Sequence, residues 1–147
     1  MKFAIDSIAE LLSSAAGKFV PAGEGEAFAD LMLNTHLRKS PRMNPLQDAL
    51  DDLKVWAANP GRELKVAMDQ AGVLILDFDG LAPTLKIKMI HDEVEARAKK
   101  NGLAAVGFRN SSAVITLEPW SYGLAQRDCV GIATFNGGTR CSVPYGG

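Results

Sequence analysis

The sequence predicts a mixed α/β fold with a mixed sheet, in which a three-helix N-terminal region precedes the order β-β-α-β-α-β. Two observations predict this fold. Apolar residues recur at helical spacing up to residue 56 and alternate with polar residues from residue 64, so the period changes from 3.6 to 2. The 147 residues are 47% hydrophobic and 22% charged, which suits one globular core. We therefore expect a helical region over residues 1–62 and an α/β portion over residues 63–147.

The first two helices are marked by their ends. Ser7 followed by Glu10 has the spacing of a capping box, in which the hydroxyl and the carboxylate satisfy the first free amides of a helix. This predicts a first helix over residues 7–17. Apolar spacing predicts a second over residues 24–38, and Pro41 excludes its continuation because proline lacks an amide proton.

The third helix and a hairpin follow. Asn44 before Pro45 combines a capping residue with a proline at the first helical position, a strong signal for a helix start. This helix is expected to end near residues 59–61. Two strand-like segments, residues 64–69 and 73–76, are separated by a tight turn at Ala71–Gly72, so we expect them to pair as a β-hairpin.

The remaining elements alternate between helix and strand. Pro83 opens a long helix over about residues 84–101, and two lysines followed by Gly102 favour its end there. A strand over residues 103–108, a helix over residues 118–128 and a last strand over residues 130–135 are expected after it.

Composition excludes several classes of function. The formal net charge of −1 argues against a surface that binds nucleic acid or an anionic membrane through bulk charge. No run of 18 apolar residues is present, so no transmembrane helix is expected. Cys129 and Cys141 are the only cysteines and fit two reduced thiols in a cytoplasmic protein. His36 and His91 are the only histidines, so a metal site built on histidine pairs is not expected.

The residues with the clearest chemistry stand at strand ends. Arg109, Asn110, Ser111 and Ser112 follow the 103–108 strand; arginine binds anions through two parallel hydrogen bonds, and the serines offer hydroxyls. The alternative is that Asn110 and Ser111 only cap a turn.

Two other polar or glycine-rich turns carry weaker signals. Asp77 and Asp79 follow the preceding strand, but two carboxylates are too few for a metal site and are typical of turns. The Gly137–Gly138 pair follows a strand without opening a helix, and the dinucleotide fingerprint G-x-G-x-x-G is absent. A phosphate site at a helix start is therefore not supported.

Several segments together resemble the malate/L-lactate dehydrogenase-like family of non-Rossmann NAD(P)-dependent oxidoreductases, which includes cyclic imine reductases. The matching segments are LDFDG, ARAKKNGLAAVGFRNS, GIATFN and VPYGG, at residues 76–80, 96–111, 131–136 and 143–147. The three N-terminal helices fit the family in order and length. The resemblance covers this whole chain but only the N-terminal half of a usual family member.

The resemblance implies a binding role for a few residues. It places Arg109, Asn110, Ser111 and Asn136 at the rim of a cofactor cleft. Arg42 is not a family match but puts a cation near the usual substrate site.

The family's two histidine positions, in contrast, are occupied by Met43 and Ala113. Neither side chain can exchange a proton, so the resemblance does not extend acid/base catalysis to this chain.

From the resemblance we expect an N-terminal subunit of a two-chain NAD(P)H-dependent oxidoreductase, in which residues 63–147 form part of an incomplete cofactor-binding domain. Its substrate would be a 2-oxo or 2-hydroxy acid, or a cyclic imino acid of the Δ1-pyrroline- or piperideine-2-carboxylate type. Because the sequence ends at Gly147, we expect a partner chain to supply the C-terminal half and share the NAD(P)H. The alternative is a catalytically inactive homologue that serves as a binding, regulatory or scaffold subunit.

Overall fold

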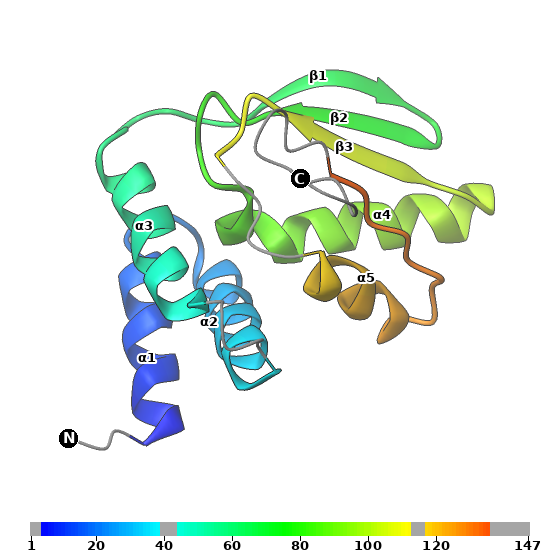
Figure 1. The fold of residues 1–147 in the computed structure, drawn as a ribbon. Coiled ribbons are helices and arrows are strands. Elements are labelled where there is room, and N and C mark those ends of the chain that lie inside the picture. Colours follow the sequence, from blue (N-terminus) through cyan, green and yellow to red (C-terminus); the bar gives the residue numbers. More distant parts are fainter. Residues whose placement is uncertain (1–3, 39–43, 113–116, 136–147) are drawn as a thin grey trace, which may run out of the picture.

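Three helices form a layer at the N-terminal side of the molecule. The computed structural model describes residues 4–38, 44–112 and 117–135. Helices α1 (Ile5–Ala16), α2 (Ala22–Arg38) and α3 (Pro45–Ala57) pack together and stand beside the sheet and its helices (Figure 1). None of the helices in the described ranges is long and apolar enough to cross a membrane.

A three-stranded sheet makes the second layer. Strands β1 (Lys65–Gln70) and β2 (Val73–Asp77) pair antiparallel, which confirms the hairpin, and β3 (Ala105–Arg109) pairs parallel to β2. A 3-10 turn, η1 (Pro83–Lys86), and helix α4 (Ile87–Asn101) connect β2 to β3. Gly102 ends α4 in the left-handed conformation, at φ 79°, as the sequence predicts.

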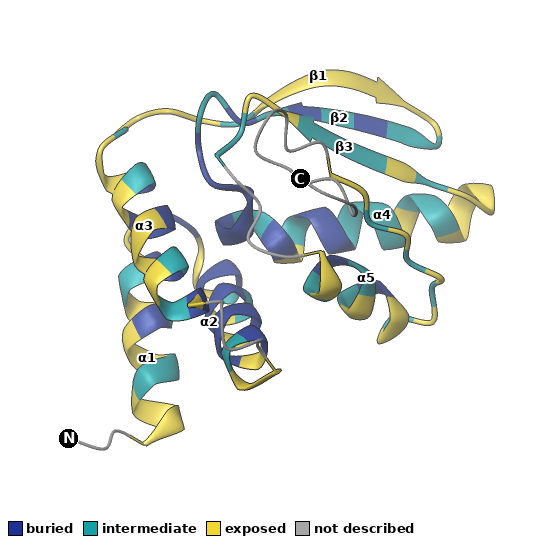
Figure 2. Ribbon diagram, in the orientation of Figure 1, coloured by how far each residue is buried: buried dark blue, intermediate teal, exposed yellow. Residues whose placement is uncertain are grey.

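The two faces of the sheet differ in burial. Leu74 and Leu76 of β2 are buried against the helices, whereas their neighbours Val73, Ile75 and Asp77 are only partly buried. The described helices all lie on one side of the sheet, and β1 is exposed along its whole length (Figure 2). The opposite face, with Ile75 at its centre, is therefore uncovered by the described part of the chain.

The segment between β2 and α4 is the centre of the core. Phe78, Leu81, Ala82 and Leu85 are completely buried in it. The indole of Trp56 on α3 donates to the carbonyl of Ala82 across 3.0 Å, so a helix of the first layer also satisfies a buried backbone group here.

Two buried carboxyl groups reinforce the same junction. Glu24 of α2 accepts a hydrogen bond from the amide of Met89, 2.9 Å away in the first turn of α4. Asp52 of α3 accepts one from the hydroxyl of Thr84 in η1. Burial raises the pKa of both carboxyl groups, that of Asp52 to about 6.

The helix limits differ from those expected in small but explicable ways. The first helix begins at Ile5, so Ser7 lies within it and makes no capping bond; Ala4 precedes it without a side-chain cap. The second helix begins two residues earlier than expected, and the predicted 118–128 helix is α5 (Glu118–Ala125). Helix ends depend on tertiary packing, which local signals do not contain.

The predicted strand over residues 130–135 is wrong. These residues have no regular secondary structure and return beside α5 instead of joining β3. A Cβ atom on Gly131 would lie 2.9 Å from the Leu124 side chain, which shows how closely the backbone passes α5. A strand needs a neighbouring strand for its hydrogen bonds, and this path provides none within the described residues.

Asp52 makes stability depend on pH. Its pKa is raised from 3.8 to about 6, so its stabilising contribution is full below pH 4 and is lost as the pH rises through 6. We expect the Asp52→Asn variant to lack this loss, which amounts to at most about 3 kcal/mol in the wild type between pH 4 and pH 7. Urea unfolding at a series of pH values measures it.

Asp51→Asn is the matched control for Asp52→Asn. Asp51 is exposed and its pKa is lowered by the hydrogen bond from Lys54, so this substitution changes the profile little and with the opposite sign. Parallel pH profiles of the wild type and Asp52→Asn would contradict the assignment.

Candidate functional site

An ion pair joins the carboxyl ends of the two parallel strands. Asp77 and Arg109 are register partners on β2 and β3, and their side chains meet at 3.1 Å between Nε and Oδ2. The other carboxylate oxygen of Asp77 accepts from the amide of Asp79 at 3.0 Å and from the side chain of Asn110 at 3.2 Å. These donors, the Asp79 amide first, hold the pKa of Asp77 below its usual value.

The two turns after these strands are tied to each other. Asp79 and Asn110 adopt left-handed backbone conformations, at φ 51° and φ 50°, which aspartate and asparagine tolerate better than most residues. The amide of Gly80 donates to the carbonyl of Asn110 at 2.6 Å, and Arg62 donates to the carbonyl of Asp79 at 2.6 Å. Asp77 and Asp79 therefore build turns, and the described residues contain no cluster of three or more possible metal ligands.

Two groups at this edge remain available to a ligand. The Arg109 side chain is 65% exposed, so most of its N–H donors face solvent. The hydroxyl oxygen of Ser112 is buried and has no hydrogen-bond partner in the described part of the chain. Asn110 instead uses its side chain in the turn. We call Arg109, Asn110, Ser111 and Ser112 the strand-end rim.

Some of the residues singled out in the sequence lie outside the described ranges. They are Arg42 and Asn136, which were expected to contact ligands, the two replaced histidine positions Met43 and Ala113, the pair Gly137–Gly138, and Cys141. The expectations for these residues stay predictions.

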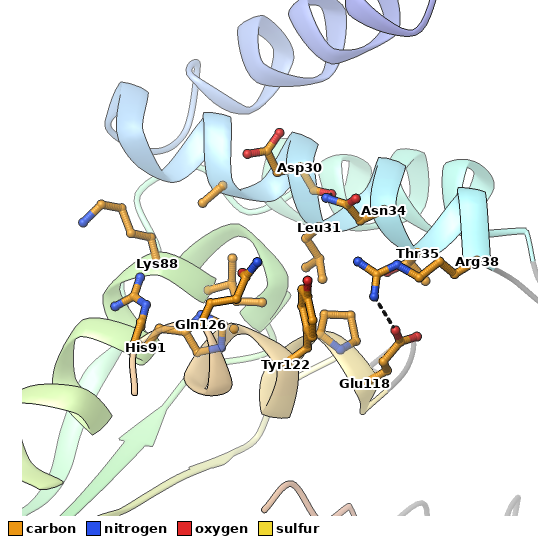
Figure 3. A pocket seen from close by; sticks show the side chains of 15 residues that line it. Asp30, Leu31, Asn34, Thr35, Arg38, Lys88, His91, Glu118, Tyr122 and Gln126 are labelled. Atoms are coloured by element: carbon orange, nitrogen blue, oxygen red, sulfur yellow. Dashed lines mark hydrogen bonds and ion pairs between the residues drawn. The ribbon is translucent and has the colours of Figure 1, made fainter. Parts of the chain in front are cut away.

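A pocket of about 450 Å³ lies between α2, α4 and α5 (Figure 3). Its walls combine apolar side chains such as Leu31 and Ile87 with polar ones such as Thr35, Arg38 and Gln126. Its lining comes from three helices that are far apart in the sequence, and none of its residues forms a motif. Sequence reasoning therefore missed the pocket.

An ion pair spans one end of the pocket. Arg38, the last residue of α2, contacts Glu118, the first residue of α5, at 2.9 Å between Nη1 and Oε1 (Figure 3). The guanidinium also lies 4.6 Å from the centre of the Tyr122 ring. Met43 and Ala113, at the family's histidine positions, are each five residues along the chain from this pair.

His91 is a packing residue. Its Nε2 atom lies 3.1 Å from the backbone carbonyl of Trp120, and since a carbonyl only accepts, Nε2 carries the proton. Burial lowers the pKa of His91, which keeps the ring neutral at pH 7. The ring packs directly on Gly123, where a Cβ atom would lie 2.2 Å from Cε1. His91 therefore fixes α5 against α4.

No protein-family model matches the chain, and no curated protein matches it. Solved structures do. Sulfolactate dehydrogenase from Methanocaldococcus jannaschii is similar with a TM-score of 0.69 and 19% identity, over 87% of this chain and 38% of that one. Malate dehydrogenase from Pyrococcus horikoshii OT3 is similar with a TM-score of 0.70 and 16% identity, over 86% and 37% of the two chains. Malate dehydrogenase from Entamoeba histolytica is similar with a TM-score of 0.70 and 20% identity, over 88% of this chain and 37% of that one.

These similarities concern the fold. The chain has the fold of the N-terminal portion of these dehydrogenases, which confirms the family resemblance at the level of structure. It spans less than two-fifths of the length of the structures that it matches.

The close packing of His91 on Gly123 predicts a strong steric effect. Gly123→Ala places a methyl group inside the imidazole ring's space and is expected to lower the free energy of unfolding by about 2 kcal/mol. Gly23→Ala, on α2 with its nearest neighbour atom at 3.7 Å, is the control and leaves stability unchanged or slightly higher. Chemical denaturation measures both.

A double variant isolates the cause. In the His91→Ala background the added methyl group has room, so Gly123→Ala costs much less there than in the wild type. Equal costs in the two backgrounds would show that the histidine ring is not what requires the glycine.

Proposed function

We propose that this chain is the N-terminal subunit of a two-chain, cytoplasmic NAD(P)H-dependent oxidoreductase. Its substrate would be a 2-oxo or 2-hydroxy acid, or a cyclic imino acid. The observation that carries the proposal is the fold, which agrees with malate and sulfolactate dehydrogenases over 86–88% of this chain. The resemblance of the 96–111 and 131–136 segments to that family supports it independently.

The strand-end rim suits an anionic cofactor. Arg109 presents exposed donors, and the buried hydroxyl of Ser112 lacks a partner among the described residues, as expected of a group that a ligand satisfies. Within the proposal, Arg109, Asn110, Ser111 and Asn136 line the cofactor side, and Arg42 attracts the substrate carboxylate. The nicotinamide group, when bound, supplies or accepts the hydride.

A second polypeptide is part of the proposal because apolar surface of this chain needs covering. Val130 is 96% exposed and Ile132 86%. The sheet face that contains Ile75 is uncovered by the described elements (Figure 1). Exposed apolar side chains and an uncovered sheet face are typical of surfaces that bind a partner. The partner would complete the sheet and share the NAD(P)H.

A catalytically inactive subunit is the second candidate, and the replaced histidines favour it. Met43 and Ala113 cannot transfer protons. His91 does not replace them, because its Nε2–H is held by a carbonyl and its ring is packed on Gly123. In this case the chain would bind and position the partner without taking part in proton transfer.

Purification of the untagged protein from its native source tests the proposal. We expect a stoichiometric second polypeptide, binding of NADH or NADPH by fluorescence titration, and oxidation of the bound cofactor by 2-oxo acids or cyclic imines. A monomer that binds neither nucleotide would refute it. Nucleotide binding with no turnover of any of these substrates would favour the inactive subunit.

Substitutions at the rim give a sharper test. Arg109→Ala is expected to weaken nucleotide binding about tenfold, the loss of one charge-assisted contact. Asp77→Asn removes the same ion pair but keeps the arginine, so binding is unchanged or tighter. Equal losses in the two variants would mean that Arg109 acts only through the strand-end turns.

A further inference from the structure

The ion pair between Arg38 and Glu118 spans one end of the pocket, and solvent weakens it. Arg38 is the last residue of α2 and Glu118 is the first of α5, and their side chains are 42% and 51% exposed. Exposed ion pairs of this kind contribute little to stability. A ligand that carries both charges can therefore part the two side chains and bind each of them.

The α2 side of this gap suits a carboxylate. Arg38 presents N–H donors there, and Thr35, one turn earlier on the same face of the helix, also lines the pocket. Thr35 is 5% exposed, and its hydroxyl group makes no hydrogen bond within the described residues. Because buried hydroxyl groups in folded proteins are nearly always hydrogen-bonded, this group fits a ligand oxygen.

The α5 side of the gap suits an ammonium group instead. Glu118 and Tyr122 are four residues apart, so they share one face of α5, and both line the pocket (Figure 3). The centre of the Tyr122 ring lies 4.6 Å from the Arg38 guanidinium, so a cation already lies beside this ring. A carboxylate and the face of an aromatic ring both attract cations.

A ligand with a single charge does not suit this pair of residues. An acid that binds Arg38 leaves Glu118 without its partner and beside a second negative charge, which opposes binding. A molecule with a carboxylate and an ammonium group on the same carbon atom satisfies both residues and leaves the net charge of the site unchanged. Free α-amino acids have these two charges at pH 7.

The rest of the pocket suits an apolar side chain. Leu31 and Ile87 are buried and line the pocket from α2 and α4. The volume of about 450 Å³ lies within the range of small-molecule sites. His91 also lines the pocket, but the carbonyl of Trp120 holds its Nε2–H, so it is not placed to exchange a proton with the ligand.

We propose that this pocket binds a free α-amino acid with an apolar side chain, as a ligand that is not transformed. Arg38 and Thr35 bind the carboxylate, and Glu118 and Tyr122 bind the ammonium group. The bound ligand joins α2 to α5 and stabilises their packing. This binding does not depend on the oxidoreductase assignment, whose substrates contain no primary ammonium group.

Calorimetric titration of the full chain with L-leucine and L-phenylalanine tests the proposal. Two controls each lack one charge of L-leucine: leucinamide has no carboxylate, and 4-methyl-2-oxopentanoate has no ammonium group. We expect L-leucine to bind about tenfold more tightly than either control, the gain of one charge-assisted contact less the weak ion pair that the ligand replaces. L-leucine is also expected to raise the temperature of thermal unfolding.

Substitutions on the two sides of the gap are expected to act alike. Arg38→Ala and Glu118→Gln each weaken binding of L-leucine about tenfold. Thr35→Val, which preserves shape, weakens it severalfold without lowering the free energy of unfolding, because the buried hydroxyl has no partner to lose. Lys54→Ala breaks an exposed ion pair on α3, away from the pocket lining, and leaves binding unchanged.

Glu118→Gln separates an amino-acid site from a site for a simple acid. If only the carboxylate were recognised, this variant would bind more tightly, because Arg38 would be released from its ion pair. Equal or tighter binding of L-leucine in Glu118→Gln would overturn the proposal. So would equal binding of L-leucine and 4-methyl-2-oxopentanoate to the wild type, or no binding of either amino acid. Circular dichroism of each variant excludes unfolding as the cause.

Titration of NADPH and NADH into the same samples distinguishes this proposal from the proposed function. Nucleotide binding without amino-acid binding refutes the pocket assignment alone. Binding of L-leucine that depends on both Arg38 and Glu118, without nucleotide binding, refutes the oxidoreductase assignment and keeps the pocket.

Discussion

The burial of the connection between β2 and α4 is the constraint on which the rest of this structure depends. Phe78 and Leu85 lie at its two ends with no exposed surface. Two of its polar groups are buried and hydrogen-bonded to α3: the carbonyl of Ala82 accepts from Trp56, and the hydroxyl of Thr84 donates to Asp52. Because leaving these buried polar groups unpaired would be costly, the hydrogen bonds hold the helical layer in its position relative to the sheet. The strand-end rim and the α2–α4–α5 pocket inherit their geometry from this position.

Local sequence signals predicted elements whose determinants are local. The hairpin, the start of α3 at Pro45 and the end of α4 at Gly102 were all predicted, since each depends on the conformational preference of a few neighbouring residues. The capping box at Ser7 and the strand over residues 130–135 were wrong. In both, the outcome depends on what the segment packs against, and the strand in addition requires a neighbour for its hydrogen bonds.

The candidate site also has a part that the sequence predicts and a part that depends on tertiary packing. That Arg109 and Asn110 would stand at a strand end followed from the sequence, but their ion pair and hydrogen bond with Asp77 depend on the register of β2 and β3. The pocket was not predictable at all. Thr35 and Glu118 are ordinary residues in their own helices, and only the packing of α2 against α5 makes them neighbours.

The hydrogen bond between Glu24 and Met89 has a consequence for how the chain folds. It joins residues 65 positions apart, and it caps the first turn of a helix whose own side chains provide no cap. Closing so long a loop is entropically costly and precedes any gain from the contacts it allows. Helix α4 therefore acquires its full stability only after α2 has docked, which couples the formation of this helix to the packing of the two layers.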